Sequence, residues 1–578
     1  SICDPACGSG AFLIAALDFL KEEHFFIDRI TAQILGHSMV SSEYEQSILE
    51  NNLFGVDVNE ESVEITKLAL LLHTAKPNRK LHFSGNKINN NIKCGNSLIS
   101  DPKIDFEKAF DWHKEFPHIF NNGGFDVVIG NPPYVDSETM FNAGLMEQRN
   151  YLSQKMQYTK GNWDLYIAFL ERSFGLLKSG GLMAMITSDK WLVKPYGDAI
   201  RLGMFHKFMF LTDCGKNVFP DANVYAVIVG ISTKDSAEIQ TARMKSNEIK
   251  VFGNISKAEI PLPYHLDWLL SDSVNFLKKI QLIKSVINGV SGISCENACA
   301  TSDCYKLKPF IENRDFQHNN DLKIINTGTI AKYIPLWGLA SMTYLKDKYK
   351  KPVINKCTFF EHFKNSYGQK SVRPKLLIKG ITLLDVCLDE KGIIVPGKST
   401  MIILDDKDNI TKLRAVMVLL NSKFAIFYIG KKYRGATYNQ SVTFTKEMIL
   451  NLPCPETFNE NMDKFAELSV KREKISPQIF EERLKFFHRV RNNLQGVRIT
   501  EMLRKFDELN FTQFVNELTK QKIRIPIKQQ NEWEEFFNHS QSKCRNITKK
   551  IDNIDRKINQ FVYELYGLTE DEIKIVEG

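Results

Sequence analysis

The chain has 578 residues, of which 43% are hydrophobic and 25% are charged, close to the composition of ordinary soluble proteins. We expect neither a membrane span, which needs about 18 predominantly apolar residues in a row, nor a cleaved secretion leader. Eleven cysteines are an odd number in a chain too long to need disulfide bonds, and they favour a reducing, cytoplasmic setting.

Charge is unevenly distributed along the chain, although the net charge is only +8. Residues 1–250 carry 25 Lys and Arg against 30 Asp and Glu, whereas residues 301–450 carry 25 against 13. This difference predicts an enzyme body joined to a module that binds a polyanion. Charge alone is equally consistent with solvated lysines that keep a large protein soluble.

Short apolar runs and amphipathic stretches alternate over the first 235 residues. Runs typical of buried strands occupy residues 1–4, 53–58, 125–129, 182–187 and 224–231, and helical spacing of apolar residues occupies residues 11–22, 60–73 and 165–177. A turn at Ser179-Gly180-Gly181 is expected to separate the last of these helices from its strand. The alternation predicts an α/β domain in which helices cover both faces of a mostly parallel sheet.

Three further regions follow. Residues 236–300 have a mixed pattern and are assigned to a connector. Residues 301–455 contain short β-like runs and one helix at 413–420, which predicts a separate α+β module. Residues 456–578 are largely helical, with charged amphipathic stretches at 462–491 and 546–565. Cys295, Cys299 and Cys304 are close in sequence, but without a paired CxxC or a His at finger spacing we expect no metal site.

The first candidate ligand site is a glycine-rich turn between the first strand and the first helix. It comprises Asp4-Pro5-Ala6-Cys7-Gly8-Ser9-Gly10. Glycines allow the backbone to approach a ligand closely, and the N-terminus of the next helix offers free N–H groups. The turn lacks the GxGxxG pattern of dinucleotide-binding proteins, and a purely structural role fits such a turn equally well.

Two polar residues follow later strands. Asp57 ends the second strand, where a carboxylate at the carboxyl edge of an open sheet suits bidentate hydrogen bonding to ribose hydroxyls. Its alternative role is to cap the next helix, although Asn59 is available for that. Asn96, in Gly95-Asn96-Ser97-Leu98, has an amide suited to reading an adenine beside Leu98.

The most specific motif is Asn131-Pro132-Pro133-Tyr134, directly after a buried strand. The two prolines fix the backbone and remove two N–H donors, which leaves the Asn131 amide oxygen and a rigid backbone carbonyl as acceptors for an exocyclic amine. Such an amine is a weak nucleophile because its lone pair is delocalised into the base. Accepting its hydrogens while it is held in line with a methyl donor favours localisation of that lone pair in the transition state. Tyr134 offers a flat face for the base.

The motifs DPACGSGAFL, FGVD, GNSL and GNPPY, in this order and spacing, resemble the gamma class of DNA amino-methyltransferases. The similarity continues through residues 161–166, 177–181 and 218–220. Residues 373–380 resemble the TaqI-like specificity domain, and residues 562–568 resemble the large type IIG restriction–modification enzymes. The resemblance implies a Rossmann-like S-adenosylmethionine-dependent methyltransferase domain over residues 1–235, followed by the connector already assigned to residues 236–300. It further implies a target-recognition domain over residues 301–455 and a helical C-terminal region over residues 456–578.

The resemblance also implies a role for each motif. Residues of the glycine-rich turn would surround the methionine part of the cofactor: Asp4, Ala6, Gly8 and Gly10. Asp57 would bind the cofactor ribose, and Asn96 with Leu98 would bind its adenine. The family often has Asp in place of Asn96, and this departure weakens that one assignment.

The catalytic motif implied by the resemblance is Asn131, Pro132, Pro133 and Tyr134. Asn131 and Pro132 would accept hydrogens from the target amine, and Tyr134 and Phe219 would stack on the two faces of a base flipped out of double-stranded DNA. In this family Asn at the first position favours the N6 amine of adenine over the N4 amine of cytosine. The function implied is site-specific DNA adenine methylation within a restriction–modification system.

The basic module is expected to contact DNA phosphates with Lys and Arg. The proposed contacts are Lys370, Arg373, Lys375, Lys379, Lys431, Lys432 and Arg434. The run at 431–435 interleaves basic and aromatic groups, but for any one of these residues a solvated surface position is the simpler interpretation.

Family members carry a further cofactor-binding segment before the first motif, and type IIG enzymes carry an upstream nuclease domain. We therefore expect this chain to be part of a longer enzyme, with an incomplete cofactor pocket and with a nuclease domain or partner outside it. Two other functions share some of these features. Glutamine methyltransferases of release factors share NPPY but are small, so the sequence after Phe219 would be unexplained. The other is a DNA-recognition component of a defence complex, with a methyltransferase body that is no longer catalytic. The intact Asn131-Pro132-Pro133-Tyr134 motif argues against it, whereas the expected absence of the upstream segment is consistent with it.

Overall fold

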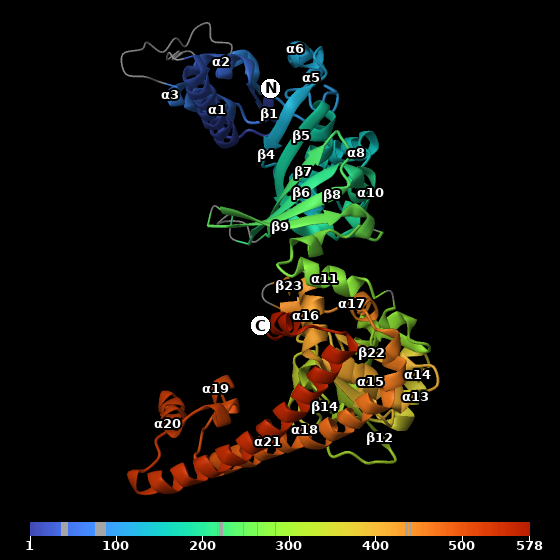
Figure 1. Cartoon of the computed structure of the whole chain (residues 1–578). Coiled ribbons are helices and arrows are strands. Elements are labelled where there is room, and N and C mark those ends of the chain that lie inside the picture. The colour runs from blue at the N-terminus through green and yellow to red at the C-terminus, as the bar shows by residue number, and fades with distance from the viewer. Residues whose placement is uncertain are drawn as a thin grey trace. The chain divides into compact units, whose positions relative to one another are not determined.

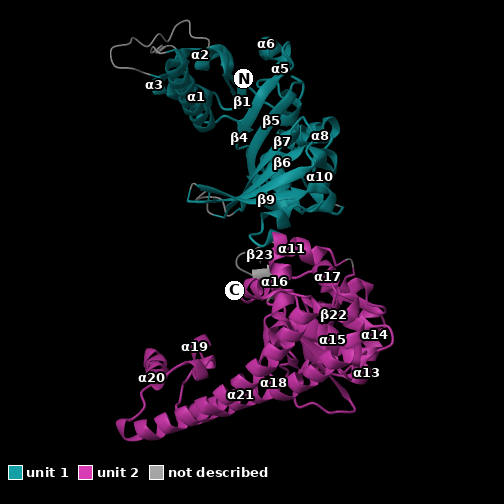
Figure 2. Ribbon diagram, in the orientation of Figure 1, with its two compact units in different colours: residues 1–274 teal, residues 275–578 magenta. Residues whose placement is uncertain are grey.

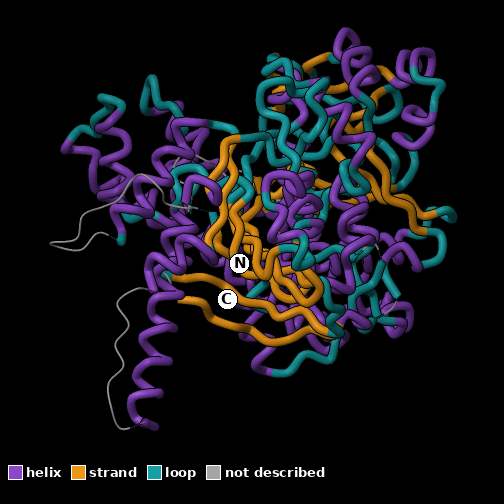
Figure 3. The backbone as a smooth tube through the Cα atoms, turned by 90° about the horizontal axis from the view of Figure 1, so that it is seen from above, coloured by secondary structure: helices purple, strands orange, loops and turns teal. Residues whose placement is uncertain are grey.

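The computed structural model describes residues 1–35, 44–74, 88–216, 218, 224–246, 248–262, 264–283, 285–433, 437–438 and 441–578. The chain divides into two compact units, Ser1–Val274 and Asn275–Gly578 (Figure 2). Helices and strands both contribute heavily to the described chain (Figure 3).

The first unit is a mixed α/β structure around a central sheet (Figure 1). Its strands are β1 (Ile2–Asp4), β2 (Leu53–Asp57), β3 (Ile92–Cys94), β4 (Phe125–Gly130), β5 (Leu177–Ser188), β6 (Phe208–Gly215), β7 (Ala226–Ser232), β8 (Glu238–Lys245) and β9 (Glu248–Ser256). Its α-helices are α1 (Ala11–Leu35), α2 (Tyr44–Asn51), α3 (Glu60–His73), α4 (Ile88–Asn91), α5 (Trp112–Glu115), α6 (Pro117–Phe120), α7 (Ser137–Asn142), α8 (Met146–Lys155), α9 (Leu165–Gly175) and α10 (Asp198–Met204).

The described strands of this sheet lie in the order β3-β2-β1-β4-β5-β7-β6-β8-β9. The first five run parallel, and β7 is antiparallel to both of its neighbours. The apolar runs of β1, β2 and β4 are buried because helices cover them, as in other parallel sheets. Leu13 of α1, Ile48 of α2 and Val63 of α3 share one apolar core with Leu53 of β2. Parallel pairing brings the carboxyl ends of β3, β2, β1 and β4 to the same edge of the sheet.

Two details of the first unit differ from the expectation. β5 begins at Leu177 and runs through Gly180 and Gly181, where a turn was expected. Gly180 has a φ of +82°, and the pairing of β4 with β5 shifts register between Phe125 and Val127, so an irregularity within the strand replaces the turn. The second difference concerns the assigned connector, because its residues form β8 and β9, which extend the central sheet beyond residue 235.

The second unit combines small sheets with long helices. Its main strands are β10 (Ile293–Asn297), β18 (Lys375–Lys379), β20 (Val386–Asp389) and β22 (Thr400–Asp405) in one sheet, and β11 (Glu312–Asn313), β12 (Asp321–Ile325), β17 (Pro352–Asn355) and β21 (Ile394–Pro396) in another. Shorter pairings join β13 (Ile330–Ala331) with β14 (Ile334–Pro335), β15 (Met342–Tyr344) with β16 (Asp347–Tyr349), and β24 (Ser441–Thr443) with both β19 (Ile381–Thr382) and β23 (Thr437–Tyr438).

The helices of this unit fall into a short group and a long group. The short group is α11 (Val274–Gln281), which begins one residue before the division, with α12 (Thr301–Leu307), α13 (Lys356–His362), α14 (Ser366–Ser371), α15 (Ile410–Asn421), α16 (Lys423–Lys432) and α17 (Lys446–Leu450). The C-terminal group is α18 (Met462–Asn493), α19 (Glu501–Arg504), α20 (Phe511–Lys520), α21 (Gln530–Leu565) and α22 (Glu570–Glu577). The long helices α18 and α21 lie side by side, with α19 and α20 near one end of the pair (Figure 1). An aromatic core that includes Phe486, Phe506, Phe514 and Phe537 joins these four helices and the turn between α19 and α20.

All eleven cysteines are free thiols. Within the described residues, no three His, Cys, Asp or Glu side chains are grouped as a metal site would require. In the same part of the chain no single helix has the length and apolar character of a membrane span. The bent pair α15 and α16 reaches that composition only when both helices are taken together.

Candidate active site

The glycine-rich turn after β1 is held in place by the neighbouring strand β2 and by α3. The Gly8 N–H donates to Oδ2 of Asp57 at 2.9 Å, and the Thr66 hydroxyl donates to the Gly8 carbonyl at 2.7 Å. Gly10 has a φ of +84°, and a Cβ there would come within 2.8 Å of the Thr66 side chain. The turn therefore requires glycine at this position for both conformation and space.

Asp57 is a structural link between the turn and the start of α3. Besides the Gly8 N–H, its carboxylate accepts the Asn59 N–H at 2.9 Å. The helix cap is Asn59, whose Oδ1 accepts the Ser62 N–H at 2.8 Å, so the role of N-cap does not fall to Asp57. Each carboxylate oxygen of Asp57 has two lone pairs, and the remaining acceptor capacity stays available to a ligand.

Asp4 lies at the end of β1 and is buried, with 1% of its surface exposed. Its Oδ1 accepts the Ala6 N–H at 3.0 Å, whereas no group in the described residues donates to its buried Oδ2. Burial raises the pKa of the Asp4 carboxyl to about 7, against the lowering effect of the Ala6 hydrogen bond, and the charge of Asp57 adds to the rise.

Asn96 follows β3 and is bound at both ends of its amide. Its Oδ1 accepts the Leu98 N–H at 3.1 Å, and its Nδ2 donates to Oδ2 of Asp105 at 2.8 Å. Asp105 in turn accepts the Lys108 N–H at 3.1 Å through Oδ1. The sequence analysis did not identify Asp105, because it stands in an irregular segment without a motif of its own.

The motif Asn131-Pro132-Pro133-Tyr134 begins directly after β4, which lies between β1 and β5 in the sheet. Oδ1 of Asn131 is buried, and no hydrogen-bond donor of the described residues reaches it. The Tyr134 hydroxyl donates to the Ile186 carbonyl at 3.2 Å, and its ring meets that of Tyr166 edge-on at 5.9 Å. Burial raises the pKa of Tyr134, so its hydroxyl stays protonated near neutral pH. The motif thus presents an acceptor without a donor beside a fixed aromatic ring.

A cavity of about 510 Å³ joins these motifs at the carboxyl edge of the sheet. The predicted residues that line it are Ala6, Asp57, Asn96, Leu98, Asn131 and Pro133. Neighbours of these residues in the predicted motifs complete part of the wall: Pro5, Val58, Gly95, Ser97 and Ile99. The rest comes from segments to which the sequence analysis gave no site residue and is mainly apolar: Met140, Leu145, Leu152, Leu165 and Phe169, with Asp105 and Gln148 as polar members. An apolar cavity with a few convergent polar groups is typical of a small-molecule site.

Residues 51–219 match the family model of the Eco57I restriction-modification methylase. These residues form an Eco57I-type restriction-modification methylase domain. A second model, a domain of unknown function (DUF8810), matches residues 458–562.

Several curated proteins are similar to parts of the chain. The type II restriction enzyme and methyltransferase RM.Eco57I of Escherichia coli is 29% identical over 34% of this chain and 21% of its own length. The type II methyltransferase M.BanIII of Aneurinibacillus aneurinilyticus is 31% identical over 26% of each chain, and M.BstVI of Geobacillus stearothermophilus is 21% identical over 58% of this chain and 69% of its own. The chain thus spans about a fifth of the length of RM.Eco57I. Among solved structures, the type IIL restriction-modification enzyme MmeI in complex with DNA covers 98% of this chain and 72% of its own, with 13% identity and a TM-score of 0.48.

Arg149 of α8 fixes the loop that precedes α9 in the methylase domain. Arg149 is buried, donates to the carbonyls of Trp163 and Gly161 at 2.9 and 3.2 Å, and lies 4.1 Å from the centre of the Trp163 ring. This arrangement sets the start of α9, which contributes Leu165 and Phe169 to the cavity wall. Phe219, the second predicted stacking residue, lies outside the described residues.

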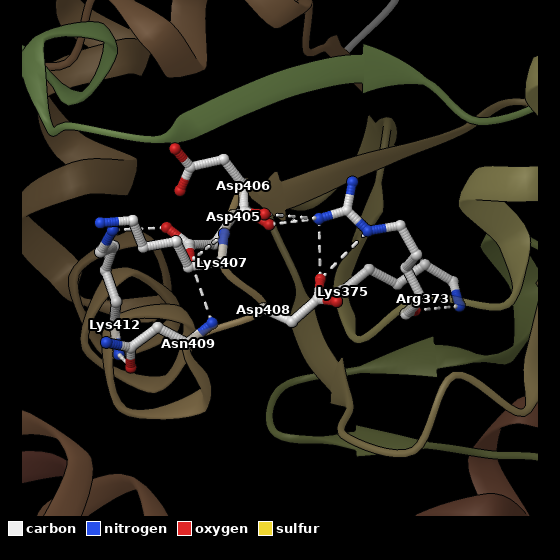
Figure 4. A network of polar contacts seen from close by, with 8 residues as sticks. All are labelled: Arg373, Lys375, Asp405, Asp406, Lys407, Asp408, Asn409 and Lys412. Carbon is white, nitrogen blue, oxygen red and sulfur yellow. Dashed lines mark hydrogen bonds and ion pairs between the residues drawn. The ribbon is translucent and has the colours of Figure 1, made fainter.

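In the second unit, Lys370, Arg373, Lys375 and Lys379 of the predicted DNA contacts lie beside carboxylates of the protein itself. Lys370 pairs with Glu296 at 3.0 Å, Arg373 pairs with Asp408 at 2.8 Å, and Lys379 lies 4.0 Å from Asp385. Figure 4 shows Arg373 bridging to Asp405 and Asp408, while Lys412 pairs with Asp405 from the other side. Arg373 and Lys412 thereby stabilise the loop after β22.

The prediction that Lys375 contacts DNA is wrong. Its side chain is fully buried and binds Oδ2 of Asp389 at 2.6 Å and the carbonyl of Ser371 at 2.7 Å. A buried, ion-paired ammonium group cannot reach a phosphate. Among the others, Lys432 donates to the Tyr428 hydroxyl at 3.0 Å and Lys431 lies over the Phe427 ring, both in the last turn of α16. Arg434 lies outside the described residues.

Replacing Asp4 with Asn should change how stability depends on pH. The folded state retains a proton on Asp4 up to about pH 7, whereas the unfolded chain loses it near pH 4. The free energy of unfolding of the parent therefore decreases as pH rises from about 4 to 7, and the variant lacks this contribution. Denaturant unfolding from pH 5 to 8 measures the difference, with the exposed Glu61→Gln as the control. Parallel pH profiles for the parent and Asp4→Asn would contradict the assignment.

Replacing Lys375 with Met should destabilise the second unit by about 3–5 kcal/mol, because Asp389 would remain as an uncompensated buried charge. The exposed Lys391→Met is the matched control and should change stability by less than about 0.5 kcal/mol. Urea unfolding of both variants gives the comparison. A Lys375→Met protein of unchanged stability would show that the pair is not a structural element.

Proposed function

We propose that this chain transfers a methyl group from S-adenosylmethionine to the N6 amine of an adenine flipped out of double-stranded DNA. The observation that carries the proposal is the buried Oδ1 of Asn131, an acceptor that no described donor reaches, at the edge of a cavity in a methylase domain. The strand order, with an antiparallel β7 between β5 and β6, supports a Rossmann-like methyltransferase sheet.

The cavity fits the cofactor in both size and chemistry. Asp57 has free acceptor capacity for ribose hydroxyls, and the apolar wall from Val58, Ile99 and Phe169 suits the faces of an adenine ring. Asp4 begins the glycine-rich turn, and no described group donates to its Oδ2, so a positively charged ligand group near the turn would favour its ionised form. S-adenosylmethionine, when bound, supplies an electrophilic methyl group.

Asp105, together with Asn96, is the proposed reader of the cofactor adenine. The Asn96 amide nitrogen is held by Asp105 and its oxygen accepts the Leu98 N–H, whereas the Asp105 carboxylate, being charged, is the stronger acceptor for an exocyclic amine in the cavity. Asn96 then acts as a positioning residue that holds this carboxylate. The departure of Asn96 from the common Asp of the family is in this way compensated by a second side chain.

The target amine is proposed to lie between Asn131 and the backbone carbonyl of Pro132. Accepting its two hydrogens directs the nitrogen lone pair outward as the amine becomes the nucleophile. Tyr134 is held by Ile186 and Tyr166, so its ring is preorganised for stacking at little cost in conformational entropy. Base flipping costs a few kcal/mol, and aromatic stacking returns about 1–3 kcal/mol of it.

The wider role follows from the relatives. RM.Eco57I is named as both a restriction enzyme and a methyltransferase, and the adenine-specific methyltransferase PglX of Lacticaseibacillus casei is 26% identical over 34% of this chain and 20% of its own length. We propose adenine methylation within a bacterial or archaeal restriction or defence system that acts in the cytoplasm, with a nuclease domain or partner outside these residues. Lys431 and Lys432 remain proposed DNA contacts.

Replacing Asn131 with Ala should slow methyl transfer about 10²–10³-fold and leave DNA binding intact. Loss of one preorganised polar contact to a reacting group lowers the rate by about 10²–10³. Labelled S-adenosylmethionine, unmethylated genomic DNA and nucleoside analysis give the readout, and label in N6-methyladenine identifies the reaction. The exposed Asn142→Ala is the control. Unchanged methylation by Asn131→Ala would rule out the proposed chemistry, and a parent that binds DNA without labelling it would favour a DNA-recognition component.

Replacing Asp105 with Asn should weaken cofactor binding about tenfold or more, because a hydrogen bond to a charged acceptor is worth about 1.5–3 kcal/mol. The exposed Glu107→Gln is the control on the same segment. Calorimetry with S-adenosylhomocysteine and with its 6-oxo analogue separates the roles, since only the amine needs an acceptor. The parent should discriminate between the two ligands more strongly than the variant. Equal discrimination would assign the adenine contact elsewhere.

A further inference from the structure

A basic cleft in the second unit is lined by charged residues to which no role has been assigned so far. It has a volume of about 670 Å³ and is formed by the segment before β17, by α18 and by α21. Its cationic lining residues are Lys350, Lys351, Lys485, Arg489, Arg491 and Lys543, with His488 and His539 beside them. Glu482 is the single acidic residue among the described lining residues.

The spacing of these residues along the two helices produces a shared face. On α18, Lys485 and Arg489 are four residues apart and Asn492 follows three later. On α21, Phe536, Ser540 and Lys543 repeat the same four-and-three spacing. Residues three and four apart lie on one side of a helix. Because α18 and α21 pack along each other, the two faces converge on the cleft.

Ion pairing neutralises only part of this charge. Lys485 pairs with Glu482 at 2.6 Å, Lys351 pairs with Asp315, and Arg489 lies 5.2 Å from the centre of the Phe536 ring. No carboxylate in the described part of the chain pairs with Lys350, Arg491 or Lys543, all of which are exposed.

The shape of the surface strengthens the effect of its charge. Phe486, Phe487 and Phe536 line the cleft beneath the cations and belong to or pack against the aromatic core of the helices. Low-dielectric walls around a concave, single-sign surface focus the electric field and attract counter-ions. Like charges gathered in this way repel one another, so the arrangement is stabilised when a polyanion binds.

We propose that this cleft binds the phosphate backbone of double-stranded DNA, independently of base sequence. The cations lie on two helices and a loop that converge on the cleft. Cations distributed in this way can contact several successive phosphates, which a single small anion would not require. The identity of the polyanion rests on the proposed methylation of DNA. Since Lys485–Lys543 fall within the domain of unknown function at 458–562, the inference gives that region a role in DNA binding.

The test is the salt dependence of DNA binding by the full chain. Each phosphate contact contributes about 0.9 to the slope of log Kobs against log salt concentration. The triple variant Lys350→Gln, Arg491→Gln and Lys543→Gln should lower that slope by about 2–3 and weaken binding of a fluorescent non-specific duplex between about 50 and 200 mM salt. The control, Lys474→Gln, Lys549→Gln and Lys550→Gln, removes the same charge from exposed positions of α18 and α21 outside the cleft.

The outcomes separate this proposal from the methylation itself. The cleft variant should lose slope while the control keeps the parent value, and circular dichroism should show both to be folded. An unchanged slope in the cleft variant, or an equal loss in both variants, would overturn the proposal. A loss confined to single-stranded RNA, with duplex binding unchanged, would overturn the assignment to DNA. A cleft-dependent slope in a parent that labels no nucleoside would refute the methylation and leave the cleft standing.

Discussion

Parallel pairing of β3, β2, β1 and β4 is the constraint on which the candidate active site depends. Each strand ends at the same edge, so the residue that follows each strand faces a common space although the four lie far apart in sequence. Asp4, Asp57, Asn96 and Asn131 are those residues or stand within two positions of them. The hydrogen bond from Gly8 to Asp57 joins the ends of β1 and β2 directly. After β3, hydrogen bonds from Leu98 to Asn96 and from Asn96 to Asp105 fix the segment that follows the strand. Any shift of strand register would separate Asp57, Asn96 and Asn131, which line one cavity.

Much of this edge could be predicted from the sequence because its signals are local. The apolar spacing of residues 60–73 gave a helix with the same bounds as α3, and Asn59 caps it as its side chain allows. The prolines after β4 restrict the backbone whatever surrounds them. Asp105 could not be predicted, since its place in the cavity depends on a loop that folds back to pair beside Asn96. The strands β8 and β9 were missed for a similar reason. Their mixed polarity reflects a position near the end of the sheet, where β9 is largely exposed.

Lysine and arginine in the second unit illustrate where a count of charges fails. Lys375 and Asp389 are 14 residues apart in sequence but opposite each other in the pairing of β18 with β20. The sequence shows two separate charges, whereas the sheet makes them one buried pair. The same holds for Lys412 and Asp405, which close the loop after β22. The basic surplus of residues 301–450 therefore includes cations that form ion pairs within the protein. The interpretation of that surplus as a DNA-binding signal was wrong for Lys375.

Cations that have no carboxylate partner and line a cleft are a better indication of a polyanion-binding surface than a count of charges. In the second unit this criterion selects the cleft between α18 and α21. Arg491 and Lys543 belong to helices whose amphipathic pattern, read from the sequence, indicates only packing. Their apolar faces do form the aromatic core, and the polar edges of the same helices meet above it. Because α18 and α21 pack along each other, Lys485 and Arg489 of one helix and Lys543 of the other gather around one cleft. The helices thus serve both as the core of the C-terminal region and as the support of its charged surface. For that reason a substitution must leave Phe486 and Phe537 untouched if it is to separate binding from folding.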